Sequence, residues 1–275
     1  MKQQSRVTEV VEQLRKTGRK AVIPYVVAGD PDADTTVLLM HALVEQGADI
    51  IELGMPFSDP SSDGPVIQLA AERALRGGMN LAGVLDIVRQ FREQDRDTPI
   101  VLMGYLNPLE VYGHERFARE ASAVGVDGLL IVDMPVTEAD EWLKHAGAEG
   151  LDTIFLVAPT TREERLDAIC QHCSGYIYYV SLKGVTGAAL SDASDIAERI
   201  GTLCRHSDLP VMVGFGIKDE ASARTMAALG DGVVVGSAIV AEIASLNETE
   251  AARDAEAARI RVELIGRIRR ALDAS

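Results

Sequence analysis

Short apolar runs alternate with longer amphipathic stretches along the whole chain. The apolar runs are rich in Val, Ile and Leu, a composition typical of strands that are buried on both faces of a parallel sheet. In the stretches between them, apolar residues recur with the period of a helix that packs through one face. The pattern predicts eight strands, at Ala21–Ala28, Ile50–Leu53, Ile100–Met103, Gly128–Val132, Thr153–Val157, Tyr176–Val180, Val211–Gly214 and Val233–Val235.

Local signals mark several helix ends. A leading helix is predicted over Ser5–Lys16 and stops at Gly18. Another is predicted over Asn80–Asp95, with the Asn80 side chain as its N-cap. Thr161 and Glu164 have the spacing of a capping box, so they are expected to open the helix that follows the fifth strand.

The final helix shows the clearest apolar face. Acidic residues precede it and arginines end it, an order that complements the helix dipole. Its apolar face is predicted to contain Ile260, Leu264, Ile268 and Leu272.

Eight strands alternating with helices predict parallel pairing, because each parallel crossover needs a helix. Closure into a single eight-stranded parallel (β/α)8 TIM barrel, with an extra N-terminal helix, is the simplest arrangement. The 275 residues suit one such domain and contain no linker-like tract, so residues 1–275 are expected to form a single domain. A doubly wound open sheet is the alternative. Its usual dinucleotide fingerprint is absent after the first strand, where Ala28-Gly29-Asp30-Pro31 stands instead.

Charge and cysteine usage narrow the class of protein. The formal net charge is −15, which argues against binding to nucleic acid or to an anionic membrane. No apolar signal core follows Met1 and no apolar run is long enough for a membrane span, so a cytoplasmic location is expected. The three cysteines are an odd number for a disulfide framework and favour a reducing compartment.

Cys170 and Cys173 have the C-x-x-C spacing of a redox centre or of half a zinc site. The chain has no second pair of this kind, and Cys204 lacks the usual spacing. The pair also falls at a helix end, away from the expected active mouth. A structural role is therefore favoured, and no metal site is predicted.

In a barrel of this kind the active site lies at the C-terminal ends of the strands. Glu52 comes near the end of the second strand, where desolvation by apolar neighbours should raise its pKa and suit it to acid–base chemistry. A structural carboxylate bonded to backbone N–H groups is the equal alternative. In the long loop that follows, Asp59 and Asp63 precede proline and glycine, so turn formation is the first interpretation for both.

Glycine-rich motifs follow the last three strands. Gly184–Gly187, Gly214–Ile217 and Gly236–Ala238 come at the strand ends, and the last of them opens a helical stretch. Backbone N–H groups beside glycine can approach an anion closely, and a helix N-terminus favours negative charge. Together the three motifs favour a phosphate site over simple turns.

The long loop and these motifs resemble the tryptophan synthase alpha subunit family. The similarity covers nearly the whole chain in order, and the Glu52–Pro65 block is its most specific part. Further similar segments are Pro24-Tyr25, Gly29-Asp30-Pro31, Tyr105 with Asn107-Pro108, Asp133-Met134-Pro135, Gly184–Gly187, Gly214–Ile217 and Gly236–Val240.

The resemblance implies a lyase that cleaves indole-3-glycerol phosphate to indole and D-glyceraldehyde 3-phosphate by a retro-aldol reaction. It implies that Glu52 is the general acid–base and that Asp63 stabilises charge on the indole ring. The implied substrate contacts are Tyr25, Tyr178, Thr186, Phe215 and Val234, and the implied phosphate contacts are Gly187, Gly216, Gly236 and Ser237.

The resemblance also implies a beta-subunit partner in an alpha2-beta2 heterotetramer. That partner would contain pyridoxal phosphate and receive the indole, while this chain would need no cofactor. Two departures from the family pattern, Leu182 in Ser181-Leu182-Lys183 and the serines in Pro60-Ser61-Ser62-Asp63, bear on this coupling rather than on the chemistry. The alternatives are a stand-alone indole-3-glycerol phosphate lyase, another phosphate-binding barrel, or a non-catalytic barrel that activates a beta-type partner.

Overall fold

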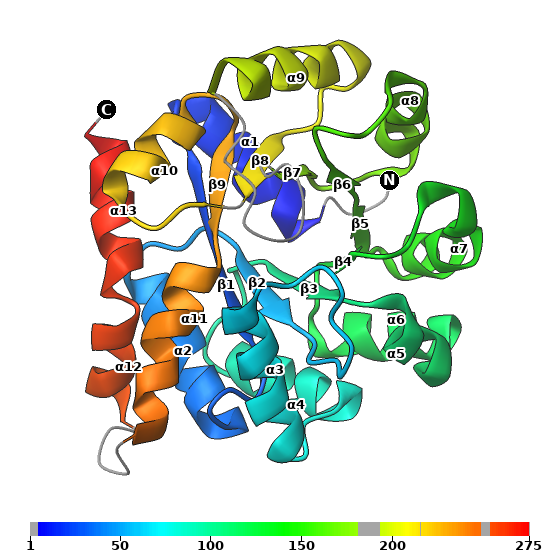
Figure 1. Ribbon diagram of the computed structural model, residues 1–275. Helices are drawn as coiled ribbons and strands as arrows, with labels where there is room; N and C mark the ends of the chain where they lie inside the picture. The colour runs from blue at the N-terminus through cyan, green and yellow to red at the C-terminus, as the bar shows by residue number, and fades with distance from the viewer. Residues whose placement is uncertain (1–4, 181–192, 215, 249–253, 275) are drawn as a thin grey trace.

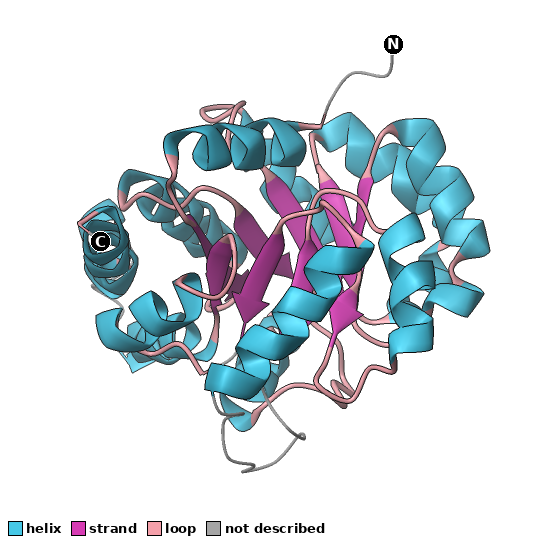
Figure 2. Ribbon diagram, turned by 90° about the horizontal axis from the view of Figure 1, so that it is seen from above, coloured by secondary structure: helices cyan, strands magenta, loops and turns pink. Residues whose placement is uncertain are grey.

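The computed structural model describes residues 5–180, 193–214, 216–248 and 254–274. Within these ranges all strand pairs are parallel, and the strand order is β5-β4-β3-β2-β1-β9-β8-β7-β6. Figures 1 and 2 show the strands at the centre and the helices around them. The strands are β1 (Ala21–Val27), β2 (Ile51–Gly54), β3 (Ile100–Gly104), β4 (Gly128–Ile131), β5 (Asp152–Ile154), β6 (Leu156–Val157), β7 (Ile177–Val180), β8 (Val211–Gly214) and β9 (Gly232–Val235).

The predicted fifth strand is divided at Phe155, which gives nine strands instead of eight. Its first part, β5, pairs with β4, and its second part, β6, pairs with β7. The carbonyl of Phe155 already accepts a hydrogen bond from the N–H of Tyr178. A single run of chain therefore passes from one neighbour to the other and closes the sheet, so the eightfold TIM barrel prediction is confirmed in its architecture.

Helices cover the outside of the barrel. The outer core between strands and helices is built mainly from Val, Leu, Ile and Ala. The helices are α1 (Arg6–Thr17), α2 (Ala33–Glu45), α3 (Pro65–Arg76), α4 (Leu81–Arg92), α5 (Leu106–Tyr112), α6 (His114–Val124), α7 (Asp140–Glu149), α8 (Glu163–His172), α9 (Ala193–His206), α10 (Glu220–Ala227), α11 (Ser237–Ala244), α12 (Ala255–Arg261) and α13 (Glu263–Asp273), with short 3-10 turns at Val136–Glu138 and Ser245–Glu248.

The predicted N-terminal helix is present as α1 and closes the end of the barrel opposite the active mouth. Val7, Val11 and Leu14 pack on the side chains that fill the barrel interior. Ser5 caps α1 by accepting from the N–H of Thr8, and the Ser5 hydroxyl donates to the Asp152 carboxylate at 2.5 Å. This end of the molecule is thus fixed by both apolar and polar contacts.

Two local predictions are wrong. The Thr161 hydroxyl is not used in a capping box, because it accepts from the N–H of Ala158, and α8 begins after Arg162 without a side-chain cap. The final helix is interrupted at Val262, so Ile260 of α12 is 57% exposed while the other residues of the predicted face are buried in α13. By contrast, Asn80 caps α4 by accepting from the N–H of Gly83, as predicted.

Across the described ranges, no helix has both the length and the apolar character needed to cross a membrane.

Candidate active site

A cavity of about 280 Å³ opens at the C-terminal ends of the strands. It contains every predicted site residue that the structure describes: Tyr25, Glu52, Asp63, Tyr178, Gly216, Val234, Gly236 and Ser237. Gly64, Pro65, Val66, Ile67, Met103 and Ile217 complete its lining. Residues from β1, β2, β3, β7 and β9 therefore meet the first turns of α3 and α11 in one pocket.

Glu52 is the buried carboxylate of this pocket. It belongs to β2, is fully buried, and accepts a hydrogen bond from the Tyr176 hydroxyl at 2.6 Å through Oε1. Its Oε2 has no hydrogen-bond partner among the described residues. Burial raises the pKa of Glu52 to about 7, although the bond from Tyr176 opposes this effect. A carboxyl group with this pKa can both release and take up a proton near neutrality.

Asp63 lies at the end of the long loop, two residues before α3 begins at Pro65. Its N–H donates to the carbonyl of Pro60, and the Gln68 amide donates to its carbonyl, so the backbone is held on both sides. Burial raises the pKa of the Asp63 carboxyl, and a hydrogen bond from Tyr105 opposes that rise. Asp63 is thus a second carboxyl group at the cavity.

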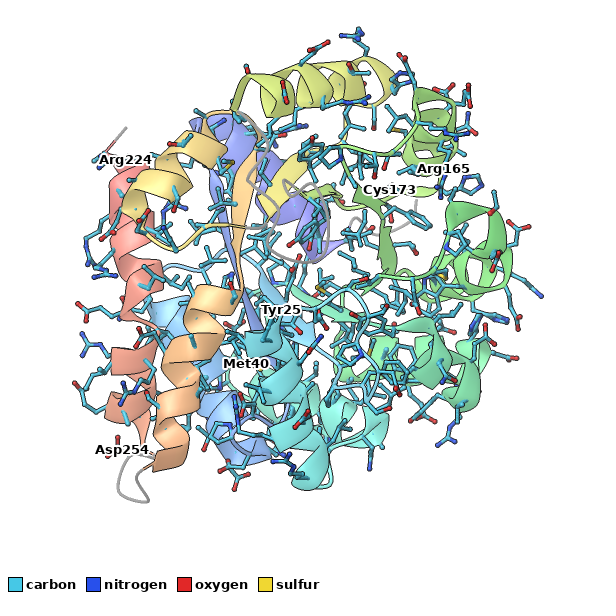
Figure 3. All side chains as sticks on the ribbon, in the orientation of Figure 1. Tyr25, Met40, Arg165, Cys173, Arg224 and Asp254 are labelled. Carbon is cyan, nitrogen blue, oxygen red and sulfur yellow. The ribbon has the colours of Figure 1, made fainter. Side chains whose placement is uncertain are left out.

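Two tyrosine rings occupy the mouth because glycines leave room for them. A Cβ on Gly54 would lie 2.2 Å from the Tyr25 hydroxyl, and a Cβ on Gly214 would lie 2.1 Å from the Tyr178 hydroxyl. Both separations are far below van der Waals contact. Glycines at the ends of β2 and β8 therefore allow the rings to lie across the strand ends, where they line the pocket (Figure 3 labels Tyr25 near the centre).

The first turn of α11 faces the cavity. Gly236 precedes the helix and Ser237 is its first residue, and both line the pocket together with Gly216 from the loop after β8. The first N–H groups of a helix have no partner within the helix, and the dipole there favours an anion. This end of the pocket can therefore accept a phosphate group.

Three predicted site residues, Thr186, Gly187 and Phe215, lie outside the described residues. The departure at Leu182 and the neighbouring Lys183 also lie outside them.

Sequence reasoning missed several residues of the site. Tyr176 donates to Glu52, and the Tyr105 hydroxyl accepts from the N–H of Ser62, next to Asp63. Met103, Val66 and Ile67 form part of the apolar wall of the pocket. The sequence did contain one signal for Tyr176. It stands two residues before Tyr178 in the same predicted strand, and side chains two apart in a strand point to the same face, here the barrel interior. The contacts of Tyr105 with the long loop have no comparable local signal.

The other candidate groups lie away from this pocket. Cys170 lies in α8 and Cys173 is the C-cap of that helix (Figure 3 labels Cys173), and both are free thiols. Burial raises the pKa of Cys173 to about 12, which keeps this thiol protonated. Trp142 is fully buried and donates to the Thr153 hydroxyl at 3.0 Å, so it acts as a packing residue. In the described part of the chain, His, Cys, Asp and Glu side chains form no cluster suited to a metal ion.

Fold and site together define the class: a TIM-barrel enzyme with a buried carboxyl group of raised pKa and a helix N-terminus at the mouth of its strands. A family model described as "Tryptophan synthase alpha chain" matches residues 11–267. The chain belongs to the tryptophan synthase alpha chain family. Its reaction is the cleavage of indole-3-glycerol phosphate in tryptophan biosynthesis, which makes it a carbon–carbon lyase.

Relatives from several bacteria support this membership. The tryptophan synthase alpha chain of Thioalkalivibrio sulfidiphilus is 54% identical over 98% of this chain and 100% of its own length. That of Alkalilimnicola ehrlichii is 54% identical over 98% of this chain and 97% of its own. A solved tryptophan synthase subunit alpha from Legionella pneumophila has a TM-score of 0.91 at 41% identity, covering 99% of this chain and 100% of that one.

Proposed function

We propose that Glu52 is the general acid–base of this reaction. The observation that supports it best is a fully buried carboxyl group with a pKa raised to about 7 and one oxygen, Oε2, that is unpartnered among the described residues. Protonated Glu52 delivers a proton to the ring carbon of indole that bears the side chain. The carboxylate then takes the proton of the adjacent side-chain hydroxyl. As the carbon–carbon bond breaks, its electron pair returns to the ring, and the hydroxyl carbon becomes the aldehyde of glyceraldehyde 3-phosphate.

Asp63 serves the same step electrostatically. Protonation of the ring carbon places positive charge on the ring nitrogen, and a nearby carboxylate stabilises that charge in the low-dielectric pocket. The apolar lining formed by Val66, Ile67 and Met103 suits the flat indole ring. Gly236 and Ser237, with Gly216, receive the phosphate, and Thr186, Gly187 and Phe215 complete the substrate contacts.

The chain acts with a partner. We propose that indole passes to a tryptophan synthase beta subunit in an alpha2-beta2 heterotetramer, that pyridoxal phosphate belongs to that subunit, and that this chain holds no cofactor. A solved relative at 37% identity is tryptophan synthase from Mycobacterium tuberculosis in an aminoacrylate-bound form, which supports the association. We also propose that residues 1–275 form one domain, because β1 near the start pairs with β9 near the end, and that the chain acts in the cytoplasm.

Replacement of Glu52 tests the assignment. Glu52→Gln keeps the size of the side chain and an acceptor for Tyr176 but cannot exchange the proton, so indole release should fall at least a thousandfold by order of magnitude. The binding of indole-3-propanol phosphate, a substrate analogue without the reacting hydroxyls, should persist. Glu72→Gln, on the exposed face of α3, is the matched control and should keep full activity. Normal turnover by Glu52→Gln would refute the role of Glu52.

The partner is tested by measuring indole release with and without a cognate beta subunit. Slow release alone and faster release with the subunit is the expected result. Equal release in both cases would identify a stand-alone lyase. No release in either case would refute indole-3-glycerol phosphate as the substrate.

A further inference from the structure

Helix α3 forms one wall of the pocket. Its first turn contributes Pro65, Val66 and Ile67 to the lining, and Asp63 stands two residues before the helix begins. The helix lies beside α11 at the mouth of the barrel and packs on β1 (Figure 1). The place of α3 on the barrel therefore sets the shape of the apolar end of the pocket.

The pocket-lining start of α3 is held only weakly by its own contacts. Gly64 is the N-cap and has no side chain, so the first turn has no side-chain cap. The most deeply buried side chains of the helix are those of Ala70 and Ala74. They share a small apolar cluster with Val27 of β1 and Val240 of α11. Because methyl groups interlock with a neighbouring surface less than larger side chains do, this face alone does not fix where α3 lies along β1.

A two-bond ion pair holds the other end of the helix. Arg73 of α3 donates to both oxygens of the Asp30 carboxylate, through Nε and Nη2, each at 2.8 Å. Asp30 lies in the loop that leaves β1 and is only 2% exposed. That loop is itself fixed, because the N–H of Gly29 donates to the Thr36 hydroxyl of α2 at 3.0 Å. Two parallel bonds set the orientation of the arginine as well as its distance from the carboxylate.

The same loop anchors the chain that follows α3. A Cβ on Gly29 would lie 2.8 Å from the Met79 side chain, so Met79 packs directly on the backbone beside Asp30. Within the described ranges, the pair with Asp30 is the one ion pair that joins α3 to another element, since Arg76 pairs with Glu72 inside the helix.

The anchored end of α3 is coupled to the pocket by the helix itself. Arg73 follows Ile67 by six residues, roughly 9 Å along the axis at the rise of an α-helix. Over so short a length the helix moves as a rigid rod. A shift or tilt at Arg73 is therefore carried to Ile67 and to the turn that lines the cavity.

We propose that Asp30 and Arg73 are positioning residues for the indole end of the substrate: their ion pair holds α3 at one place on β1, and α3 in turn holds the apolar wall and Asp63 beside the ring. This inference rests on the proposed function, in which the ring lies against that wall and the phosphate lies at α11. Because α11 packs on β1 directly, the phosphate end does not need the pair. A merely structural pair would instead weaken the binding of every ligand along with the fold.

The test is the double variant Asp30→Asn with Arg73→Met. Removal of Arg73 alone would leave the buried Asp30 carboxylate without its partner, whereas the double variant keeps both side-chain sizes and buries no unpaired charge. We expect kcat/KM for indole release to fall roughly tenfold to a hundredfold, because a misplacement of about 1 Å can cost about a hundredfold.

Binding of two ligands separates positioning from stability. The dissociation constant of indole-3-propanol phosphate, measured by calorimetric titration, should rise roughly tenfold, since its ring loses contact with the wall. That of glycerol 3-phosphate, which has no ring, should stay within about twofold. Arg73→Lys keeps the charge but loses the two-bond fork, so it should give an intermediate loss for the ring-bearing ligand.

Arg76→Met is the matched control. Arg76 lies on α3 as well, but its partner Glu72 belongs to the same helix and both side chains are exposed. The variant loses the same charge and one ion pair without changing any contact between α3 and the barrel. Its kcat/KM and both dissociation constants should equal those of the parent.

The parent and the double variant test different statements. Parental kcat/KM and parental affinity for indole-3-propanol phosphate in the double variant would overturn this inference alone. An equal loss of affinity for both ligands, with a lower melting temperature, would also overturn it, because the pair would then only stabilise the fold. Failure of the parent itself to release indole or to bind indole-3-propanol phosphate would refute the proposed function, and this inference with it.

Discussion

A carboxyl group buried as deeply as Glu52 affects the stability of the fold as well as its chemistry. Its pKa is raised from the usual 4.5 to about 7 in the folded state by burial. The folded protein therefore holds a proton between these pH values that the unfolded chain has released. Protonation favours folding, so the stability contributed by this group is fully present below pH 4.5 and is lost as pH rises through about 7.

Glu52→Gln should consequently be more stable than the parent above neutrality. The shift corresponds to a difference on the order of 3 kcal/mol once Glu52 is ionised, and the difference should vanish near pH 4.5, where both side chains are neutral. Thermal melts of the two proteins at about pH 5 and about pH 8 measure it, and the variant should gain several degrees only at the higher pH. An equal difference in melting temperature between variant and parent at the two pH values would mean that the surroundings of Glu52 do not force it to be neutral.

The residue scale also shows where sequence reasoning succeeds and where it stops. Glu52 could be predicted because a carboxylate in an apolar strand is anomalous in the local sequence. Tyr176 could not be assigned to it, because their hydrogen bond joins residues 124 positions apart. The same holds for Tyr105 and Ser62, which are separated by 43 positions. Contacts across a barrel depend on strand register, and a single sequence fixes register only loosely.

At the scale of elements, α11 is the helix whose orientation matters most for binding. It begins at Ser237 beside the pocket, and its N-terminal N–H groups and dipole favour an anion there. Ser237→Asp would place a carboxylate where the phosphate is proposed to bind. We expect KM for indole-3-glycerol phosphate to rise roughly tenfold or more from charge repulsion alone. Initial-rate measurements over a range of substrate concentrations give the value.

Ser245→Asp is the control for this prediction. Ser245 is the C-cap of the same helix, so the substitution adds the same charge at the end remote from the pocket. It should leave KM unchanged even if it lowers thermal stability slightly, because a negative charge is unfavourable at a helix C-terminus. Equal KM values for Ser237→Asp and the parent would remove α11 from the phosphate site.

Elements were predicted best where local patterns decide them. The strands and α4, with Asn80 as its cap, are set by apolar periodicity and by a side chain that bonds its own helix. The predicted capping box failed because the Thr161 hydroxyl bonds a neighbouring turn instead of the helix. The division of the fifth strand at Phe155 follows from barrel closure, and no periodicity within that strand shows it.

At the scale of the whole molecule, barrel closure brings distant parts of the chain together. β1 pairs with β9, and Arg269 of α13 donates to the carbonyl of Lys20, just before β1, and to the Asp49 carboxylate, just before β2. At the opposite end of the strands from the pocket, Asp127 joins Arg6 of α1 to Arg92 of α4. Several ion pairs of the closed frame thus lie at the end opposite the active mouth, while the Asp30–Arg73 pair lies at the mouth itself.

The net charge of −15 lowers the stability of the folded molecule as a whole. Folding brings the excess carboxylates closer together, and this self-repulsion opposes the compact state. The ion pairs at the surface offset it only weakly, since an exposed pair contributes about 0–1 kcal/mol. Added salt shortens the screening length from about 30 Å at 0.01 M to about 8 Å at 0.15 M, so it should relieve repulsion between charges spread over the barrel.

We therefore expect the melting temperature to rise by a few degrees between about 0.01 M and 0.15 M salt, equally with sodium and potassium chloride. Equality of the two salts matters, because screening depends on ionic strength and a specific cation site would distinguish the ions. Differential scanning calorimetry at neutral pH measures the change, with a neutral osmolyte of equal osmolality as the control. A melting temperature that falls with salt would mean that the surface ion pairs outweigh the net repulsion, and that the acidic surface is arranged to stabilise the fold.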